Sequence, residues 1–495
     1  MKKKINLIIL IFFLIFFITR LFVSQTLDGN TILTTKINLA YLDKNFLDIF
    51  IFNHTIPSGH LLIAKVISLV KDQSLITKIY YILNIFFSLG SVMLIYKTLN
   101  IFFKNKIILF YILFLISFLL IPYELWRLNH HDHINILNIS YVIWAFKEFL
   151  YNKKINNLII SLILLNFFYS LGFIITILTL LTIFLFNQEN QFFKINFLKI
   201  ISPILIILII FTKNYYTVNS FAPTSMSGAN LIQRTIHSIG EQQFIILINK
   251  NKNTFPEWWH ELVTKIKLEN NYKNLDKNII ISNFAHGNIS DTLYKNTIEY
   301  NNLKYKDKKL FKYIIQDINN LKNSEKNNLY KFGYNQTLAS SYYQSFGKLV
   351  FLKACIDYPY QMFIGNIGAK GFFLTTLQSL SFGSLFPTYY ENNLTYWNSY
   401  LFYYVQFFRV IILSIFILNL MNVILIIKKI FTKRHNKNDV LLLFINTLIF
   451  SGSIITSIIT CCENPRIMAI YFPAFICISI MNIVFLYKRN FNNNS

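Results

Sequence analysis

The chain has 495 residues, of which 54% are hydrophobic and 17% aromatic, and it carries a formal net charge of +25. Uncharged apolar runs such as 107–121 exclude an ordinary soluble protein and predict a polytopic membrane protein. The charge does not indicate a nucleic-acid partner, because many lysines border apolar runs, where they mark topology, and no basic and aromatic module stands apart. The four cysteines show neither a disulfide framework nor a metal-binding spacing.

The N-terminal segment 1–23 begins with lysines and continues as an apolar run. The run is longer than a signal-peptide core and lacks a small-residue cleavage site, so we expect an uncleaved first transmembrane helix that starts in the cytoplasm. Residues 24–75 then form a first external loop. Its apolar pieces 46–52 and 61–70 are too short to cross a bilayer and are predicted to be helices at the membrane interface.

Basic turns alternate with the remaining apolar runs, as the positive-inside rule requires. The alternation puts residues 122–133 on the same external side as the first loop. Residues 158–186 are too long for one span and are predicted to form two short helices that bend near Ser170–Gly172. Further spans are expected at about 76–97, 107–122, 134–151, 195–212, 400–427, 439–459 and 467–487.

The predicted fold class is therefore all-α, a polytopic membrane protein with about ten transmembrane helices, juxtamembrane helices in the first external loop and a mixed periplasmic region. The chain is expected to divide into an N-terminal transmembrane module (1–212), a periplasmic loop region (213–347), an interfacial or re-entrant segment broken by Gly and Pro (348–399), and C-terminal transmembrane helices (400–495).

Asp28 lies just past the first predicted helix, in the stretch Thr26-Leu27-Asp28-Gly29. A carboxylate there has the position that a base needs to take a proton from an acceptor group at the membrane surface. Asp-Gly is also a common turn pair, so a turn residue is the alternative interpretation.

Two histidines, His54 and His60, flank Pro57 in the same external loop, ahead of an apolar segment. Pro57 is suited to the start of a helix, and Gly59 would let another backbone come close. The imidazoles are candidates for binding a phosphate oxygen or relaying a proton, and simple solvation is the alternative.

A polar stretch between two apolar runs contains Glu124, Arg127, His131, Asp132 and His133. Ionisable residues at a membrane boundary predict a functional site. The His-Asp-His sequence leaves a protein-bound metal open, although consecutive side chains point in different directions and familiar zinc sites space their ligands more widely. A hydrogen-bonded carboxylate beside imidazoles is the second interpretation, and interfacial anchoring is the third.

The last external turn contains Glu463-Asn464-Pro465-Arg466. Arg466 has the chemistry to clamp a lipid phosphate with two hydrogen bonds, and Glu463 would orient it. A plain loop in which the Arg side chain reaches the interface is the alternative.

These stretches together resemble the C-type glycosyltransferase superfamily, in particular its branch of protein O-mannosyltransferases and the lipid A aminoarabinose transferase. In that branch an acidic residue follows the first helix, as Asp28 does, and a juxtamembrane proline segment follows, which 54–57 is similar to. Bacterial relatives carry a Tyr-Glu-X-Trp stretch, matched by 123–126, and an Asp that opens the fourth helix, matched by Asp132. Similar segments also occur at 221–230 and 463–466. Some relatives place a Lys directly before the loop proline, and here that position is Ile56.

The resemblance implies an inverting transfer of a sugar from a polyprenyl-phosphate donor to a lipid, glycan or protein acceptor. The enzyme would lie in the bacterial inner membrane with its active site facing the periplasm, and 1–212 would be its catalytic module. Asp28 and Asp132 are the expected catalytic residues; no cofactor is firmly implied, and a divalent metal is left open. The expected substrate-binding residues are His54, His60, Glu124, Arg127, His131, Glu463 and Arg466.

Two membrane proteins of other classes are the rival interpretations. A flippase or transporter of lipid-linked sugars predicts charged residues within the spans, whereas the ionisable clusters here fall at external ends. An O-antigen polymerase or ligase would have a large, late, Arg-rich external loop, whereas the large loop here is in mid-chain and Lys-rich.

Overall fold

The computed structural model describes residues 58–70, 73–103, 132–186, 190–218, 227–251, 347–365, 417–432, 434–459 and 471–492, with positions 109, 221–222, 253 and 376. Every regular element within these ranges is helical, and they contain no strand. This agrees with the predicted all-α class.

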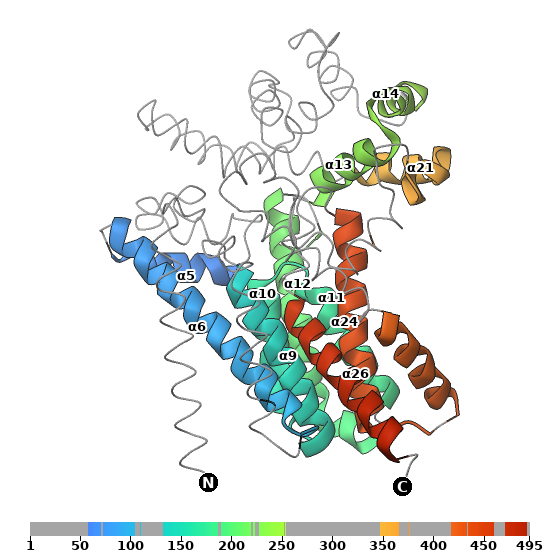
Figure 1. The fold of residues 1–495 in the computed structure, drawn as a ribbon. Coiled ribbons are helices and arrows are strands. Elements are labelled where there is room, and N and C mark those ends of the chain that lie inside the picture. Colours follow the sequence, from blue (N-terminus) through green and yellow to red (C-terminus); the bar gives the residue numbers. More distant parts are fainter. Residues whose placement is uncertain are drawn as a thin grey trace, which may run out of the picture.

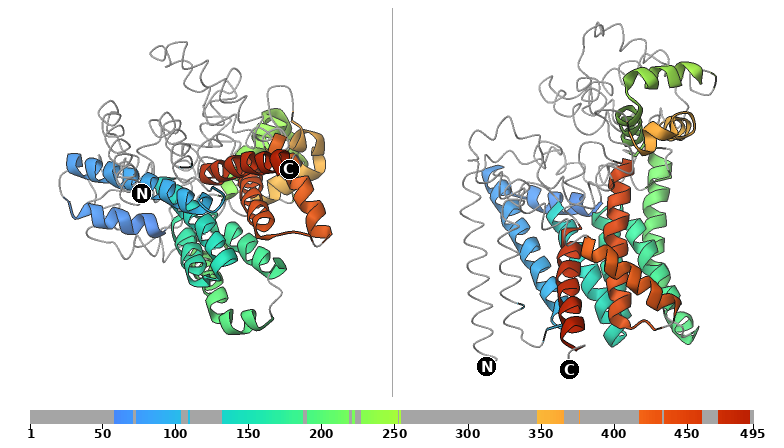
Figure 2. Two further views of the ribbon diagram at one scale, coloured as in Figure 1. Left: turned by 60° about the horizontal axis from the view of Figure 1, so that its bottom comes forward. Right: turned by 45° about the vertical axis from the view of Figure 1, so that its right-hand side comes forward.

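Among the described residues, the main helices run side by side and form one bundle (Figure 1). The views in Figure 2 show that the bundle carries shorter helices across one end. The long helices are α6 (Gln73–Leu99), α9 (Asp132–Asn152), α10 (Ile155–Phe168), α11 (Gly172–Phe186), α12 (Asn190–Val218), α24 (Lys437–Ile459) and α26 (Phe472–Asn492). The shorter ones are α5 (Ser58–Ser68), α13 (Ser227–Ile239), α14 (Glu241–Lys250) and α21 (Pro359–Phe363), and residues 347–357 and 417–431 are also helical.

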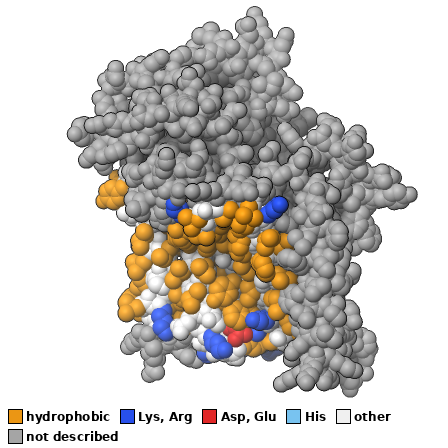
Figure 3. Space-filling model, turned by 90° about the vertical axis from the view of Figure 1, so that its left-hand side faces the viewer, with side chains coloured by type: hydrophobic (Ala, Val, Ile, Leu, Met, Phe, Trp, Pro, Cys, Tyr) orange, Lys and Arg blue, Asp and Glu red, His pale blue; other side chains and the backbone are white. Residues whose placement is uncertain are grey.

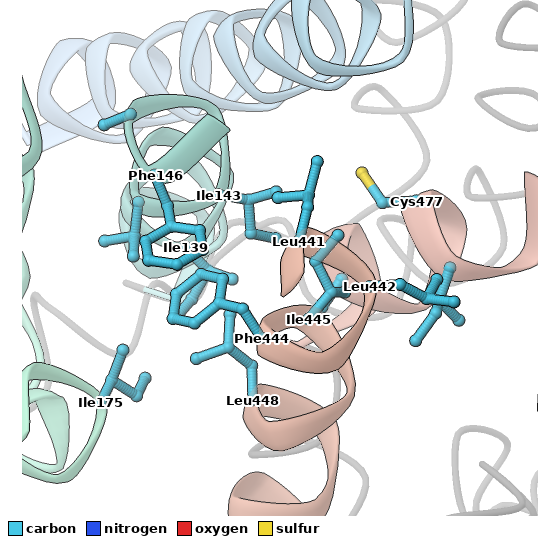
Figure 4. Close-up of a cluster of buried hydrophobic side chains, with 14 of the residues drawn as sticks. Ile139, Ile143, Phe146, Ile175, Leu441, Leu442, Phe444, Ile445, Leu448 and Cys477 are labelled. Atoms are coloured by element: carbon cyan, nitrogen blue, oxygen red, sulfur yellow. The ribbon is translucent and has the colours of Figure 1, made fainter. Parts of the chain in front are cut away.

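The hydrophobic core lies between α9 and its neighbours α6, α10, α24 and α26. The rings of Phe146 on α9 and Phe444 on α24 stack with their centroids 3.9 Å apart. Around them lie fully buried aliphatic side chains such as Ile139 and Leu448 (Figure 4). These side chains join the N-terminal helices to the C-terminal ones, so the described parts of the two halves fold as one unit.

The outer surface of the bundle is also apolar. On α12, Leu198 is 81% exposed and Ile209 is 63% exposed. Figure 3 shows a band of hydrophobic side chains with Lys and Arg at its two edges. In the part of the chain that the structure describes, two stretches, Ile82–Leu99 and Asn196–Tyr216, are long and apolar enough to cross a membrane. An apolar exterior with basic edges is the pattern expected of helices in a bilayer.

Two basic turns meet at one end of the bundle. The turn between α9 and α10 contains Lys153 and Lys154, and α24 begins next to it. Tyr151 donates a hydrogen bond to Asn438, and the Lys437 ammonium lies 5.7 Å from the centre of the Tyr151 ring. The sequence predicted that these turns share one side, and the structure places them together.

Several predicted elements are present with small changes in their bounds. The two short helices within 158–186 are confirmed as α10 and α11, which break between Phe168 and Gly172. The helix predicted at 467–487 begins later, at Phe472. Helix α12 continues through residues 213–218, which the sequence pattern assigned to the external loop, because its apolar and aromatic residues extend to Val218.

Candidate functional site

Helix α5 lies across the end of the bundle and contacts α10 and α6 (Figure 1). Its first turn rests on Phe168, the last residue of α10. A Cβ atom at Gly59 would come 2.4 Å from the Phe168 ring, so glycine is needed for this contact. Gly59 therefore allows a close approach as predicted, although the group that approaches is a side chain and not a backbone.

His60 follows Gly59 and packs against the same ring. The ring centroids of His60 and Phe168 are 5.7 Å apart, with the planes at 74°, and His60 is 3% exposed. The interpretation of His60 as a solvated loop residue is therefore wrong, because α5 folds onto α10 and covers the imidazole. Its roles in phosphate binding or proton relay stay predictions.

The outer face of α5 is apolar as well. Leu62 and Val66 are 39% and 66% exposed on one side of the helix, and Leu69, directly after its end, is 67% exposed. A helix with a buried face and a second, exposed apolar face fits a position at a membrane surface. This arrangement agrees with the interfacial helix predicted for residues 61–70.

Asp132 is the first residue of α9, as the resemblance predicted for an Asp that opens a helix. A carboxylate at this end is stabilised by the partial positive charge of the helix N-terminus. Because a tight turn joins the end of α9 to the start of α10, Asp132 at the start of α9 and Phe168 at the end of α10 both lie far from that turn. The rise of 1.5 Å per residue puts Asp132 about 30 Å and Phe168 about 20 Å from the turn. The start of α9 and the residue that α5 contacts, Phe168, therefore lie at the same end of the bundle, within about 10 Å of each other along its axis.

The His133 side chain contacts α6. Its Nδ1 atom lies 2.9 Å from the Ser88 hydroxyl, and the imidazole is 1% exposed. His133, one of the three consecutive residues that were candidate metal ligands, is thus hydrogen-bonded to Ser88. Among the residues that the structure describes, no group of three His, Cys, Asp or Glu side chains could hold a metal ion.

The contact between His133 and Ser88 belongs to a polar seam between α6 and α9. Ser91 and Ser140 are joined by a hydrogen bond of 2.5 Å between their hydroxyl groups, and Asn84 is 1% exposed on the same side of α6. Sequence reasoning missed this seam. The signal was present, because Asn84, Ser88 and Ser91 recur at helical spacing within an otherwise apolar run.

Residues 221–222 and 227–230, the described parts of the segment 221–230, also lie at this end of the molecule. The Asn214 side chain on α12 donates a hydrogen bond of 2.7 Å to the carbonyl oxygen of Ala222, and residues 227–230 form the first turn of α13. On α13, Arg234 is only 3% exposed, and the sequence analysis did not single it out. A guanidinium is thus held at the end of the bundle that carries α5 and the start of α9.

The other predicted site residues lie outside the described residues, as does the side chain of Asp132. They are Asp28, His54, Glu124, Arg127, His131, Glu463 and Arg466.

No protein-family model, curated protein or solved structure matches the chain.

Proposed function

We propose that the protein is an integral-membrane glycosyltransferase that moves a sugar from a polyprenyl-phosphate donor to a lipid, glycan or protein acceptor. In this proposal about ten helices span the bacterial inner membrane, and the active site faces the periplasm. The basic turns at Lys153 and Lys437 then lie in the cytoplasm, and α5 lies at the periplasmic surface of the inner membrane.

The observation that carries the proposal is the position of α5 relative to α9. A short helix with an exposed apolar face crosses the bundle beside the end at which Asp132 opens a long helix. A carboxylic residue that opens a helix near the level of a membrane-surface helix suits transfer from a lipid-borne sugar, because the donor phosphate stays at that surface.

The chemistry is a single displacement at the anomeric carbon. The acceptor oxygen or nitrogen attacks this carbon and loses its proton to Asp28, while the bond from the anomeric carbon to the phosphate oxygen breaks. The polyprenyl phosphate leaves with the bonding electrons, and Arg466 stabilises the charge that develops on it. Asp132 supports the same pocket. One displacement inverts the anomeric configuration.

Two ion pairs within the bundle agree with an enzyme better than with a flippase. Lys147 and Glu148, 2.7 Å apart, lie in the last two turns of α9, and Lys429 and Asp439, 3.0 Å apart, lie beside the first turn of α24. Both pairs therefore lie near the end that carries the basic turns, where they anchor helices. A transport path would place charges midway along the helices.

The test is transfer from a panel of radiolabelled polyprenyl-phosphate sugars in membranes that contain the wild type, Asp28→Asn or Glu148→Gln. We expect transfer by the wild type and its loss in Asp28→Asn. We expect transfer to be retained in Glu148→Gln, because Glu148 lies at the end of the bundle opposite to α5 and the start of α9. Equal amounts of folded protein must be shown for all three variants. Full transfer by Asp28→Asn would remove Asp28 from the mechanism, and transfer by none of the proteins from any donor would contradict the proposal.

A further inference from the structure

The helical segment 347–363 has an exposed apolar face that the proposed chemistry does not use. Residues 347–357 form one helix and α21 forms the next, and the two are separated by Tyr358, whose backbone is not helical (φ −133°, ψ 52°). Two hydrogen bonds bridge this break, because the Tyr358 amide donates to the Ala354 carbonyl at 2.8 Å and the Met362 amide to the Tyr358 carbonyl at 3.0 Å. The segment is therefore two short helices joined directly, and each has a buried and an exposed side.

One face of this segment is buried and the opposite face is apolar and exposed. Val350, Ala354 and Met362 are 0%, 0% and 3% exposed, and α13 packs against α21. The exposed apolar residues recur at a spacing of three and four within the helix at 347–357 and again at and just after α21, and together they form what we call the apolar stripe. The stripe consists of Leu349, Leu352, Ile356, Tyr360, Phe363 and Ile364, which are 39%, 58%, 71%, 62%, 40% and 45% exposed.

The orientation of the stripe is fixed by contacts on its other side. Asp357 accepts a hydrogen bond of 3.3 Å from Lys250 of α14, and α13 contacts both α21 and α24. Figures 1 and 2 show α13 and α21 lying across the bundle, just beyond the ends of α12 and α24. The exposed face of α12 reaches this level at Tyr215 and Tyr216, which are 45% and 74% exposed. Exposed tyrosines at the end of an apolar helix are typical of the interface between lipid and water.

The charges beside the stripe indicate which surface covers it. Lys348 and Lys353 are the only charged residues at 347–356, and Asp357 is already paired with Lys250. A helix with a long apolar face and lysines beside it binds anionic lipids, because the aliphatic part enters the bilayer and the ammonium groups reach the phosphates. A water-soluble protein partner would not explain why exposed tyrosines, Tyr215 and Tyr216, lie at the same height along the bundle as the stripe.

We propose that the apolar stripe lies in the outer leaflet of the membrane, at the boundary between head groups and acyl chains, and that its partner is an anionic bilayer surface. The helix thereby anchors α13 and α14 to the membrane. This inference rests on the membrane part of the proposed function and is independent of sugar transfer.

The test uses spin labels on the full-length protein in nanodiscs that contain phosphatidylglycerol, with the native cysteines replaced. Labels are placed at Ile356→Cys and, as a second site, Leu352→Cys. The lipid control is Ile209→Cys on α12, and the water control is Asn253→Cys, since Asn253 is exposed. Collision rates with oxygen and with a water-soluble nickel chelate report depth. We expect the labels at 352 and 356, like the label at 209, to collide more often with oxygen than with the nickel chelate. The label at 253 should collide more often with the nickel chelate.

Four results would count against the inference. Nickel collision at 352 and 356 equal to that at 253 would put the stripe in water, and low collision with both reagents would show that protein covers it. If the label at 209 is also in water, the membrane proposal itself fails, which distinguishes the two claims. An unchanged depth in nanodiscs of phosphatidylcholine alone would contradict the anionic preference.

Discussion

Four asparagines join three C-terminal helices inside the bundle, and their removal gives a sharp prediction. Asn422 donates to Asn482 at 2.9 Å, Asn482 donates to Asn419 at 2.9 Å, and Asn419 donates to Asn446. Asn446 and Asn482 are each 1% exposed, and Asn419 is 4% exposed. The network links the helix at 417–431 to α24 and α26, and its central side chains are buried.

The substitution Asn446→Leu keeps most of the side-chain volume but removes the acceptor for Asn419. A buried donor that loses its partner costs about 1–3 kcal/mol in water-soluble proteins. Hydrogen bonds between membrane helices are worth about 0.6 kcal/mol on average and about 1.7 kcal/mol at most, because separated helices find other partners. We therefore expect Asn446→Leu to lower the free energy of unfolding by about 1 kcal/mol.

The double substitution separates the network from simple packing. We expect Asn419→Leu with Asn446→Leu to cost at least about 0.5 kcal/mol less than the sum of the single costs, because the second change finds its partner already missing. Reversible unfolding in mixed detergent micelles measures these values. Thr447→Val is the matched control, since the Thr447 hydroxyl donates within α24 to Leu443 at 2.9 Å. Additive costs, or an Asn446→Leu effect no larger than that of Thr447→Val, would refute the reasoning.

Three further predictions concern close contacts and the backbone, and thermal unfolding in detergent tests each. Gly59→Ala should destabilise the protein by about 1–3 kcal/mol through overpacking against the Phe168 ring, and the added change Phe168→Leu should recover part of the loss. Gly452→Ala should cost a similar amount, because its Cβ would come 2.6 Å from the buried Tyr471 ring; an unchanged midpoint would contradict this packing. Lys153 has a φ of 57°, so Lys153→Gly should stabilise by about 0.5–1 kcal/mol. An equal gain from glycine at the next position would show that φ is not the cause.

The break between α10 and α11 could be predicted from the sequence because its cause is local. The apolar run is too long for one span, and small residues near Ser170–Gly172 interrupt it. The structure adds why glycine stands there: a Cβ atom at Gly172 would come 2.9 Å from the carbonyl oxygen of Leu165. Patterns of run length and small residues therefore locate helices and turns well.

The surroundings of the histidines could not be predicted in the same way. His60 contacts Phe168, and His133 contacts Ser88, so each partner comes from another helix. Helical spacing indicates which residues share a face, but not which helix that face meets. The asparagine network could not be predicted for the same reason, because its single polar residues lie on different apolar helices and come into contact only when the bundle is assembled.

The most direct test of the proposed function is sugar transfer by the purified wild-type protein in lipid vesicles, with the anomeric configuration of the product determined. We expect transfer from a polyprenyl-phosphate sugar with inversion at the anomeric carbon, and loss of transfer in Asp28→Asn. Movement of the intact lipid-linked sugar across the vesicle membrane without any transfer would rule out the glycosyltransferase and favour a flippase.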